Sequence, residues 1–530
     1  MIRFLKRGQK CLKFSNKLLE EHEKMKQCDV LLINPPATSA IMPQDQRIID
    51  YFNCISRLDF LGDSDIEPNY GLFSIAAYLK KECAPIRRKL KKSTLTIEYV
   101  DLNLYDQNLR AKEKRPINKT DIEKIISGYN CYIAGISFMT VSYGTWAEII
   151  IDEVYKRSNY IFLGGIHPTV RYREIFEKFP AQINGIIIGE GERVFFEIVH
   201  EILHNGNNLE RIEHLCTIKK VEEDPNVKIS PARLDGSFLG NLPNPDYGLL
   251  YKQNQEIIAR VYSSRGCIND CSICSVGSFF HADCFADPAL IDVNILVKKI
   301  GELYDQNKIK HFVLGDLDIS DKPRLKKFLN GLILLNKQKN IKKDWWCQTR
   351  GDSDIIDDTT AKLLKGAGFK QIAIGCEGAT DEQLQTINKN EYVSSVKNAL
   401  TILTQDAGLS TQGYWIIGLP YDDEEKVRKT QKKILEYLEA GIVTVPHITV
   451  LVPYPNTELM KNENTNGIRI INWDYKDYWM NCDLYGCGKP VYETIDQSGN
   501  TLLTSDQIYT LWIDTLQKVT EFYNNRRKTS

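Results

Sequence analysis

Short apolar runs that end in glycine, proline or a polar residue recur along most of the chain. Runs of this kind, bounded by turn residues, are typical of buried parallel strands. Segments with helical periodicity lie between them, such as 146–155 and 296–304. Strands that alternate with helices predict parallel sheets covered by helices. The chain is therefore expected to be an α/β protein.

The runs fall into two groups. The first group consists of 29–34, 95–100, 132–137, 160–165 and 184–188. It predicts a doubly wound, Rossmann-like sheet, on which ligands bind beyond the carboxyl ends of the strands. The second group consists of 256–262, 311–315, 344–349, 371–375, 412–417 and 446–451. It predicts a partial, TIM-like (β/α)6 barrel whose chemistry lies at the carboxyl-end mouth.

The 530 residues are enough for about two or three domains. A polar stretch rich in turn residues separates the two groups of strands and marks the boundary. The predicted parts are an N-terminal helix at 1–27, the doubly wound domain at 28–205, a connector at 206–255, the barrel at 256–460 and a small, mainly helical C-terminal cap at 461–530. We expect the cap to lie over the barrel mouth.

Three cysteines follow the first barrel strand in one short loop. Three residues separate Cys267 from Cys271, and two separate Cys271 from Cys274. Thiolates at such tight spacing bind iron–sulfur clusters, and three of them leave the fourth iron of a cubane open. The alternative is a structural zinc site, for which His281 or Cys284 is the candidate fourth ligand. The chain has 14 cysteines without a regular framework, which favours a reducing compartment over disulfides.

The pattern Cys-x3-Cys-x2-Cys resembles the signature of radical S-adenosylmethionine (SAM) enzymes, which bind SAM at the open iron of a [4Fe–4S] cluster. Ile273 stands where that family usually has an aromatic residue. The resemblance implies that Gly315 and Asp316 hold the SAM amino group and that Glu377 lies near the ribose. Arg350 is a candidate partner of the SAM carboxylate, because a guanidinium holds carboxylates bidentately. The alternative is that Asp318, Arg350 and Glu377 form ion pairs along the rim.

The first domain resembles the cobalamin-binding domain that precedes the radical SAM core in one large subfamily. Its matching parts are Asn34-Pro-Pro36, Gly135-Ile-Ser137, Gly164-Gly-Ile-His167 and Gly189-Glu-Gly-Glu192. The resemblance implies cobalamin contacts from Ser137, Thr140, Gly164, Gly165, His167, Gly189 and Glu190. Asp-x-His-x-x-Gly, the pattern of proteins that ligate cobalt through histidine, is missing, so a bound cobalamin is not expected to be His-ligated. Alternatively, His167 only orients its loop, and the domain binds no cobalamin.

Together the two resemblances imply a cobalamin-dependent radical SAM methyltransferase that methylates an unactivated carbon. Cyclisation or ring rearrangement with the same cofactors is the second hypothesis. A zinc-stapled binding protein without catalysis is the third. The enzyme hypotheses imply a small-molecule or peptide substrate and an external one-electron reductant resembling flavodoxin or ferredoxin.

The formal net charge of −1 gives no indication of nucleic-acid binding or of a charged membrane surface. No apolar run reaches the length of a membrane span. The N-terminus lacks the apolar core of a signal peptide. We therefore expect a cytoplasmic protein.

Overall fold

The computed structural model divides into two compact units, each with its own parallel sheet. Unit 1 comprises Met1–Met42, Asn69–Arg233 and Leu242–Asn254, and unit 2 comprises Pro43–Pro68, Leu234–Asn241 and Gln255–Ser530. Within these ranges the structure describes residues 25–37, 45–56, 58, 69–83, 95–204, 208–247, 257–280, 287–306, 309–316, 321–351, 354–461, 466–475 and 489–529. The predicted helix at 1–27 falls almost entirely outside the described residues.

The sheet of unit 1 has the strand order β2-β1-β3-β4-β5-β6. Its strands are β1 (Lys26–Asn34), β2 (Ile97–Asp101), β3 (Tyr129–Ser137), β4 (Ser158–Gly164), β5 (Gly185–Ile187) and β6 (Leu215–Cys216). All neighbours are parallel except β5 and β6. This order confirms the doubly wound prediction, and it places the reversal of strand order, where such sheets bind ligands, between β1 and β3.

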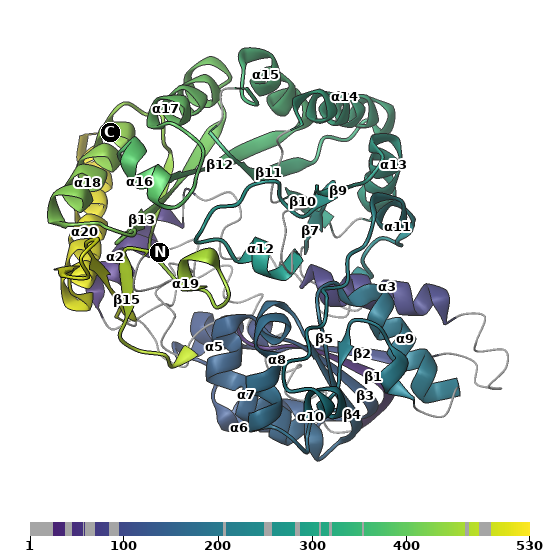
Figure 1. Cartoon of the computed structure of the whole chain (residues 1–530). Helices are drawn as coiled ribbons and strands as arrows, with labels where there is room; N and C mark the ends of the chain where they lie inside the picture. The colour runs from purple at the N-terminus through teal and green to yellow at the C-terminus, as the bar shows by residue number, and fades with distance from the viewer. Residues whose placement is uncertain are drawn as a thin grey trace. The chain divides into compact units, whose positions relative to one another are not determined.

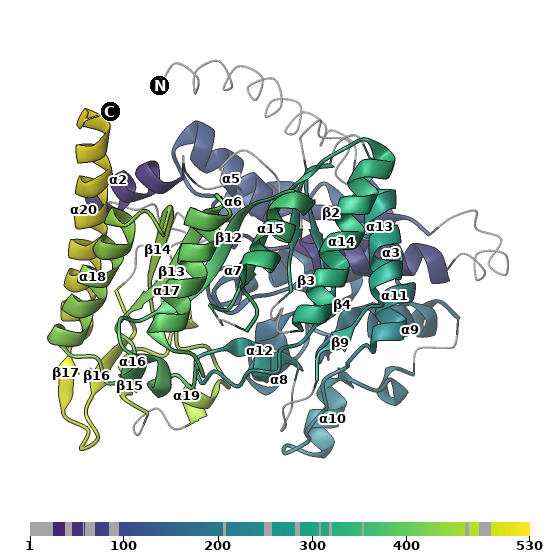
Figure 2. The ribbon, with the colours of Figure 1, turned by 90° about the horizontal axis from the view of Figure 1, so that it is seen from above.

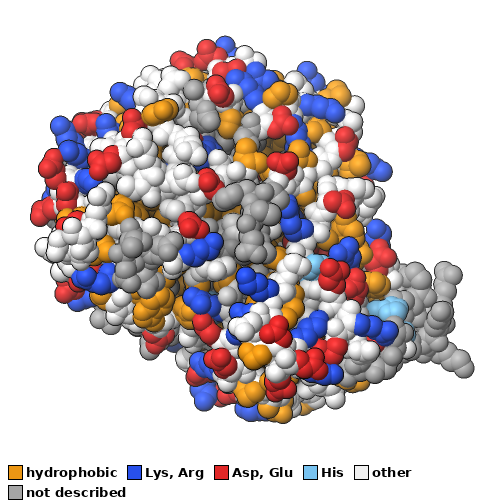
Figure 3. Space-filling model, in the orientation of Figure 1, with side chains coloured by type: hydrophobic (Ala, Val, Ile, Leu, Met, Phe, Trp, Pro, Cys, Tyr) orange, Lys and Arg blue, Asp and Glu red, His pale blue; other side chains and the backbone are white. Residues whose placement is uncertain are grey.

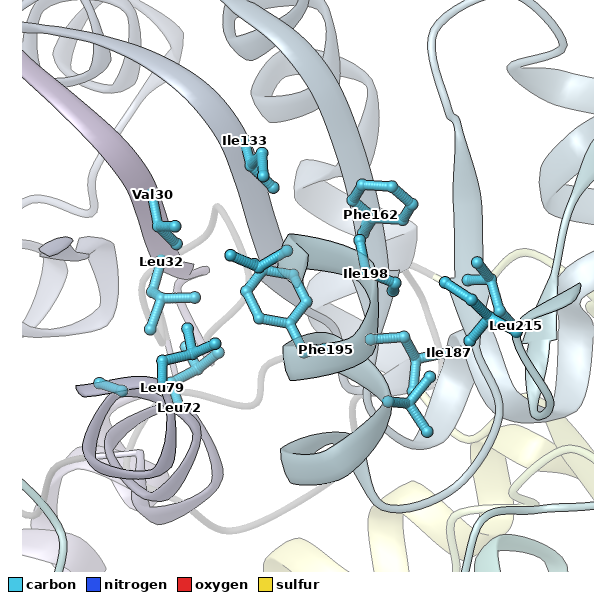
Figure 4. Close-up of a cluster of buried hydrophobic side chains, with 14 of the residues drawn as sticks. Val30, Leu32, Leu72, Leu79, Ile133, Phe162, Ile187, Phe195, Ile198 and Leu215 are labelled. Carbon is cyan, nitrogen blue, oxygen red and sulfur yellow. The ribbon is translucent and has the colours of Figure 1, made fainter. Parts of the chain in front are cut away.

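Helices cover the sheet of unit 1 on both faces. They are α3 (Tyr70–Glu82), α5 (Leu102–Glu113), α6 (Lys119–Ile126), α7 (Thr140–Tyr155), α8 (Ile166–Lys178) and α9 (Gly191–His204). Figure 4 shows α3 and α9 packed on one face, where Leu79 and Phe195 meet Leu32 and Ile133 of the sheet. Burying such side chains contributes about 1.5–3 kcal/mol each. A Cβ at Gly135 would come within 2.9 Å of the Phe195 ring, so this glycine makes room for α9.

The expected connector at 206–255 is divided between the two units. β6 pairs with the edge strand β5 and extends the sheet of unit 1. α11 (Gly236–Asn241) belongs to unit 2 and contacts the short strand β9 (Ala289–Leu290). A two-residue strand such as β6 has no periodicity that a sequence pattern could show.

Unit 2 is built on a six-stranded parallel sheet with the order β14-β13-β12-β11-β10-β7. Its strands are β7 (Ile257–Val261), β10 (Ile309–Leu314), β11 (Asp344–Thr349), β12 (Phe369–Glu377), β13 (Ser410–Ile417) and β14 (Val445–Val450). They match the six predicted strands one for one. Because neighbouring strands follow in sequence, the sheet confirms the partial barrel.

An outer layer of helices surrounds these strands (Figure 1). It includes α13 (Val293–Tyr304), α14 (Lys322–Lys339), α15 (Asp358–Ala367), α17 (Val393–Thr401) and α18 (Glu424–Glu439). Asp292, Asp321, Asp357 and Asp423 cap four of them by accepting backbone N–H groups of the first turn. None of the described helices combines the length and apolarity needed to cross a membrane.

The C-terminal part contains a small sheet that sequence analysis did not predict. β15 (Ile468–Ile470), β16 (Tyr492–Ile495) and β17 (Thr501–Leu503) form three antiparallel strands before the long helix α20 (Ser505–Thr529). β16 reaches the end of β13, where the Tyr492 hydroxyl donates to the Gly418 carbonyl at 2.7 Å. The small sheet thus lies against the rim of the barrel.

α20 lies beside the barrel rather than over its mouth. It packs against α18, β14 and α2 (Gln46–Ile55), and Figure 2 shows α18 and α20 side by side. Trp512 donates its indole N–H to the carbonyl of Ile448 at 2.9 Å, and Tyr51 of α2 donates to Pro446 at 2.5 Å. α20 and α2 therefore complete the outer layer at the last strand, and the expectation of a helix over the mouth is wrong for α20.

Charged side chains of both signs are interspersed on the face drawn in Figure 3. Many form surface pairs, such as Lys178 with Glu148 and Lys429 with Glu425. This distribution agrees with the near-zero net charge.

Candidate functional site

The cysteine loop leaves the barrel at the carboxyl end of β7. It runs through the short strand β8 (Ser264–Arg265) and Gly266, whose φ of +99° reverses the chain just before Cys267. The helix α12 (Ser275–Phe280) begins directly after Cys274. Sequence therefore places all three thiols on one loop at the barrel mouth, as predicted.

Asp316, at the end of β10, holds the start of this loop. Its buried carboxylate accepts the Ser263 N–H at 2.5 Å and the Ser264 N–H at 3.0 Å, and it also takes the Ser263 hydroxyl. Arg324 of α14 donates to the Ser263 carbonyl at 2.8 Å. Burial raises the pKa of Asp316 to about 6, against the lowering effect of the two serines. Both carboxylate oxygens are thus used within the chain.

The middle of the loop is held by two further segments. The Ser272 N–H donates to the Ile387 carbonyl at 2.9 Å, and Asn388 donates to the Asp270 carbonyl at 3.2 Å. On the other side, Leu459 of α19 (Glu458–Lys461) donates to the Ser272 carbonyl at 2.9 Å. The cysteine loop is therefore fixed by backbone contacts that do not involve the thiols.

The three thiols are close enough to affect one another's ionisation. The pKa of Cys274 is raised to about 11, mostly by burial, with a smaller contribution from the nearby Cys271 and Cys267. Asn269 donates both its backbone and its side-chain N–H to the Cys267 sulfur at 3.4 Å. Within the described ranges, no three His, Cys, Asp or Glu side chains are placed to hold a single metal ion. The candidate fourth zinc ligands His281 and Cys284 lie outside those ranges.

Glu377 ends β12 beside the cysteine loop in an unusual backbone conformation. Its φ of 56° is in the left-handed region, which is strained for a residue with a side chain. The pairing of β12 with β13 shifts register between Gly375 and Glu377, so the strand bulges there. The Glu377 carboxylate lies 2.8 Å from the Lys389 ammonium.

Four charged residues form a chain of ion pairs beside the thiols. Lys389 lies between Glu377 and Glu391, and its ammonium is 3.4 Å from the Glu391 carboxylate. The Arg350 guanidinium at the end of β11 is 3.3 Å from Glu391 and 3.9 Å from the Cys271 sulfur. The rim ion pairs predicted for Arg350 and Glu377 are therefore present, with two partners that the sequence did not reveal. We call these four residues the charge chain.

Contacts within the charge chain change the pKa of Lys389, and its cations change the pKa of the neighbouring Cys271 thiol. Burial lowers the pKa of Lys389, but Glu377 and Glu391 outweigh it, and the net shift is upward. Lys389 therefore stays protonated. At Cys271, burial raises the thiol pKa, whereas Lys389 and Arg350 act in the opposite direction. The two cations thus favour a thiolate next to them.

The residues predicted for cobalamin lie at the carboxyl edge of the unit 1 sheet. Ser137 and Gly164 end β3 and β4, while Thr140 begins α7. Gly165, His167, Gly189 and Glu190 follow β4 and β5. The Thr140 hydroxyl is buried and has no hydrogen-bond partner among the described residues. A buried polar atom of this kind is available to a ligand.

The glycines at this edge have different roles. A Cβ at Gly165 (φ +98°) would lie 2.6 Å from the Phe138 carbonyl, and one at Gly189 (φ +87°) would lie 2.6 Å from the Ala232 backbone. These two glycines therefore let neighbouring loops of the chain touch. At Gly164 the nearest such atom is 4.0 Å away, on Ile187. Gly164 is thus the glycine that leaves space beside its backbone.

His167 is fully buried in the same region. Its ring stacks on that of Tyr143, with centroids 4.2 Å apart and an interplanar angle of 22°. Burial lowers the pKa of His167 to about 3, and the positive charge of Arg171 adds to the effect. The imidazole is therefore neutral, and its stacking ties α8 to α7.

A polar network fixes the turn after β1. Asn34 donates to Asp101 at 2.9 Å, and Asn69 donates to Asn34 at 3.0 Å. The Tyr99 hydroxyl donates to the other oxygen of Asp101 at 2.6 Å. The network joins the ends of β1 and β2 to the start of α3 and supports the Asn34-Pro-Pro36 turn next to the strand-order reversal.

Comparison with known proteins finds a family match within unit 2 and relatives for about 60% of the chain. Residues 261–434 match the Radical SAM superfamily. An anaerobic magnesium-protoporphyrin IX monomethyl ester cyclase of Rubrivivax gelatinosus is 26% identical over 330 residues, which cover 60% of this chain and 55% of that protein. The bacteriochlorophyllide d C-8(2)-methyltransferase of Chlorobaculum tepidum is 24% identical, with 64% of this chain and 70% of that protein covered. The chain thus spans little more than half of the first of these relatives.

A solved structure shares the fold over nearly the whole chain. It is the radical SAM methyltransferase TsrM from Kitasatospora setae, with cobalamin and a [4Fe–4S] cluster bound. The TM-score is 0.62 at 15% identity, and the match covers 93% of this chain and 89% of TsrM. Residues 261–434 are thus a radical SAM domain, in a chain that has the fold of a cobalamin-dependent radical SAM enzyme.

Proposed function

We propose that this chain binds a [4Fe–4S] cluster, SAM and cobalamin and uses them to methylate an unactivated carbon of a small-molecule or peptide substrate. The observation that carries the proposal is the loop with Cys267, Cys271 and Cys274, which follows the first strand of a six-stranded parallel barrel. Three thiols suit a cluster with one open iron. An external one-electron reductant, resembling flavodoxin or ferredoxin, is part of the proposal.

The residues around the thiols fit this role. When bound, the cluster supplies one electron to SAM, and cobalamin carries the methyl group. Glu377 and Arg350 lie beside the thiols, where we assign them to the SAM ribose and carboxylate. Asp316 acts through its hydrogen bonds to the loop, while Gly315 brings the backbone close to β7. Arg350 and Lys389 provide positive charge next to the Cys271 sulfur.

The carboxyl edge of unit 1 fits cobalamin. Gly164 leaves space beside the backbone, and the buried Thr140 hydroxyl has no hydrogen-bond partner among the described residues. Ser137, Gly165, His167, Gly189 and Glu190 shape the surrounding loops. Since His167 is buried against Tyr143, it supports its loop, and we assign cobalt no histidine ligand.

Cyclisation is the second candidate reaction, because a relative at 26% identity is named a cyclase. Product analysis separates the two. A methylated product together with S-adenosylhomocysteine supports methyl transfer. Formation of 5′-deoxyadenosine alone, with an unmethylated product, favours cyclisation or rearrangement.

Metal and cofactor analysis of the anaerobically reconstituted full chain tests the proposal. We expect about four irons and four sulfides per chain, and cobalt retained after gel filtration. Cys271→Ala should lose the cluster, whereas Cys131→Ala, a buried cysteine on β3 of unit 1, should keep it. Zinc in place of iron, or a full cluster in Cys271→Ala, would overturn the assignment.

A further inference from the structure

We propose that Lys389 is a positioning residue for SAM binding: it fixes Glu377 and, through Glu391, Arg350 beside the cysteine loop. The inference rests on the proposed function, because it assigns a role toward SAM. Lys389 itself is not assigned to touch SAM. It acts through the two residues that we place at the ribose and the carboxylate.

Lys389 occupies a position where lysine is rare. Its side chain is 7% exposed, and lysine is almost never this buried unless it is paired. The ammonium donates to the Gly375 carbonyl at 2.7 Å and to Glu377 at 2.8 Å. The residue comes from the loop between α16 (Asp381–Thr386) and α17, and so reaches back to the end of β12.

The Glu377 conformation depends on this contact. A left-handed backbone is strained for a glutamate and persists only where its surroundings hold it. Gly375 leaves room for the contact between Lys389 and Glu377. A Cβ at this position would lie 2.5 Å from the Lys389 nitrogen and would also collide with the Glu377 carboxylate. A residue with a side chain at 375 would therefore push the pair apart.

Glu391 extends the contact to Arg350. Its carboxylate is 1% exposed, and among the described residues neither oxygen has a hydrogen bond of ordinary geometry. The two ion pairs, to Lys389 at 3.4 Å and to Arg350 at 3.3 Å, are what compensate the buried charge. Breaking a buried pair on one side leaves an uncompensated charge. Loss of Lys389 therefore also disturbs the anchor of Arg350.

The cysteine loop does not depend on Lys389 in the same way. Asp316 and Leu459 hold its backbone from segments that carry no residue of the charge chain. We therefore expect Lys389→Met to retain the cluster and to weaken SAM binding by about ten- to a hundredfold, the loss that is typical when a residue supporting a metal ligand is removed. A cluster-positive, SAM-deficient protein is the signature of a positioning residue.

Equilibrium SAM binding and electron paramagnetic resonance of the reduced cluster, recorded with and without SAM, test this on the full chain. The variants are Lys389→Met and Lys389→Arg. Lys426→Met is the matched control, because half-buried Lys426 also forms an ion pair, at 2.8 Å with the exposed Glu382. We expect SAM to shift the cluster spectrum in wild type, Lys426→Met and Lys389→Arg, and not in Lys389→Met at the same SAM concentration.

The possible results separate the two proposals. A wild-type chain that binds no cluster would refute the proposed function. A wild-type chain with cluster and SAM, beside a Lys389→Met variant with unchanged SAM affinity, would refute the positioning role alone. If Lys389→Met does not fold, Gly375→Ala decides, because it keeps every charge and displaces only the pair. A cluster-containing Gly375→Ala protein must then lose SAM affinity, and wild-type affinity would refute the role.

Discussion

Replacing Asp316 by asparagine should change how the stability of unit 2 depends on pH. The asparagine oxygen can still accept the N–H groups of Ser263 and Ser264, as Oδ1 of Asp316 does. Its amide nitrogen can donate to the Ser263 hydroxyl, which also accepts from Arg324 at 3.1 Å. The variant is therefore expected to keep the cysteine loop in place while removing one titrating group.

The magnitude follows from the pKa of Asp316, which burial raises from its ordinary value of 3.8 to about 6. Between these values the folded chain holds a proton that the unfolded chain has released. Unfolding is then favoured as pH rises, so wild-type stability falls from pH 3.8 and levels off above pH 6. A shift of about two units corresponds to about 3 kcal/mol. Asparagine does not titrate, so the stability of Asp316→Asn does not fall in this way as pH rises.

Urea unfolding of the iron-free proteins between pH 4 and pH 8, followed by tryptophan fluorescence, measures the difference. Trp345 and Trp346 of β11 report on the neighbouring strand. We expect Asp316→Asn to gain about 3 kcal/mol relative to wild type between pH 4 and pH 7. Parallel pH profiles would refute the reasoning. If wild type instead gained stability relative to Asp316→Asn as pH rises, the hydrogen bonds to Asp316 would favour its carboxylate form more than burial penalises that form.

Two further substitutions test other parts of the structure. Gly165→Ala should displace the loop after β3, because its Cβ would lie 2.6 Å from the Phe138 carbonyl, and should reduce the cobalt retained after gel filtration. Gly240→Ala in α11, where a Cβ would meet side-chain atoms only from 3.6 Å on, is the comparison, and equal retention in both would contradict the assignment. Tyr492→Phe removes the donor to a carbonyl after β13 and should lower the free energy of unfolding by about 1–3 kcal/mol in urea titrations, with no loss contradicting the rim contact.

The strands β1 to β5 of unit 1 and the barrel strands were predictable because each is a short apolar run with a turn residue at its end. Sequence patterns did not predict β6 or the strands of the small C-terminal sheet. These strands have two to four residues, too few for a periodic pattern, and tertiary contacts decide their pairing.

For the candidate site, too, the sequence indicated some residues and not others. The cysteine spacing and the polar residues at strand ends drew attention to the thiols, Arg350 and Glu377, which the structure places beside one another. Lys389 and Glu391 lie between two helices, where charged residues are normally solvated, and no local signal shows that they are buried. Asp316 lies at the end of a barrel strand, as expected, but no sequence pattern shows that its carboxylate accepts hydrogen bonds from Ser263.

The packing of α2 and α20 on β14 has a consequence for how unit 2 is made. The Tyr51 hydroxyl contacts the strand 395 residues further along the chain, and Trp512 contacts it from the C-terminal helix. The main segment of unit 1 lies between α2 and the barrel in sequence. During synthesis, at about 5–20 residues per second, unit 1 is complete well before α20 leaves the ribosome. The contact that α20 makes with β14 therefore forms only after the rest of the barrel has been synthesised, so covering the last strand is a late, long-range step in the folding of unit 2.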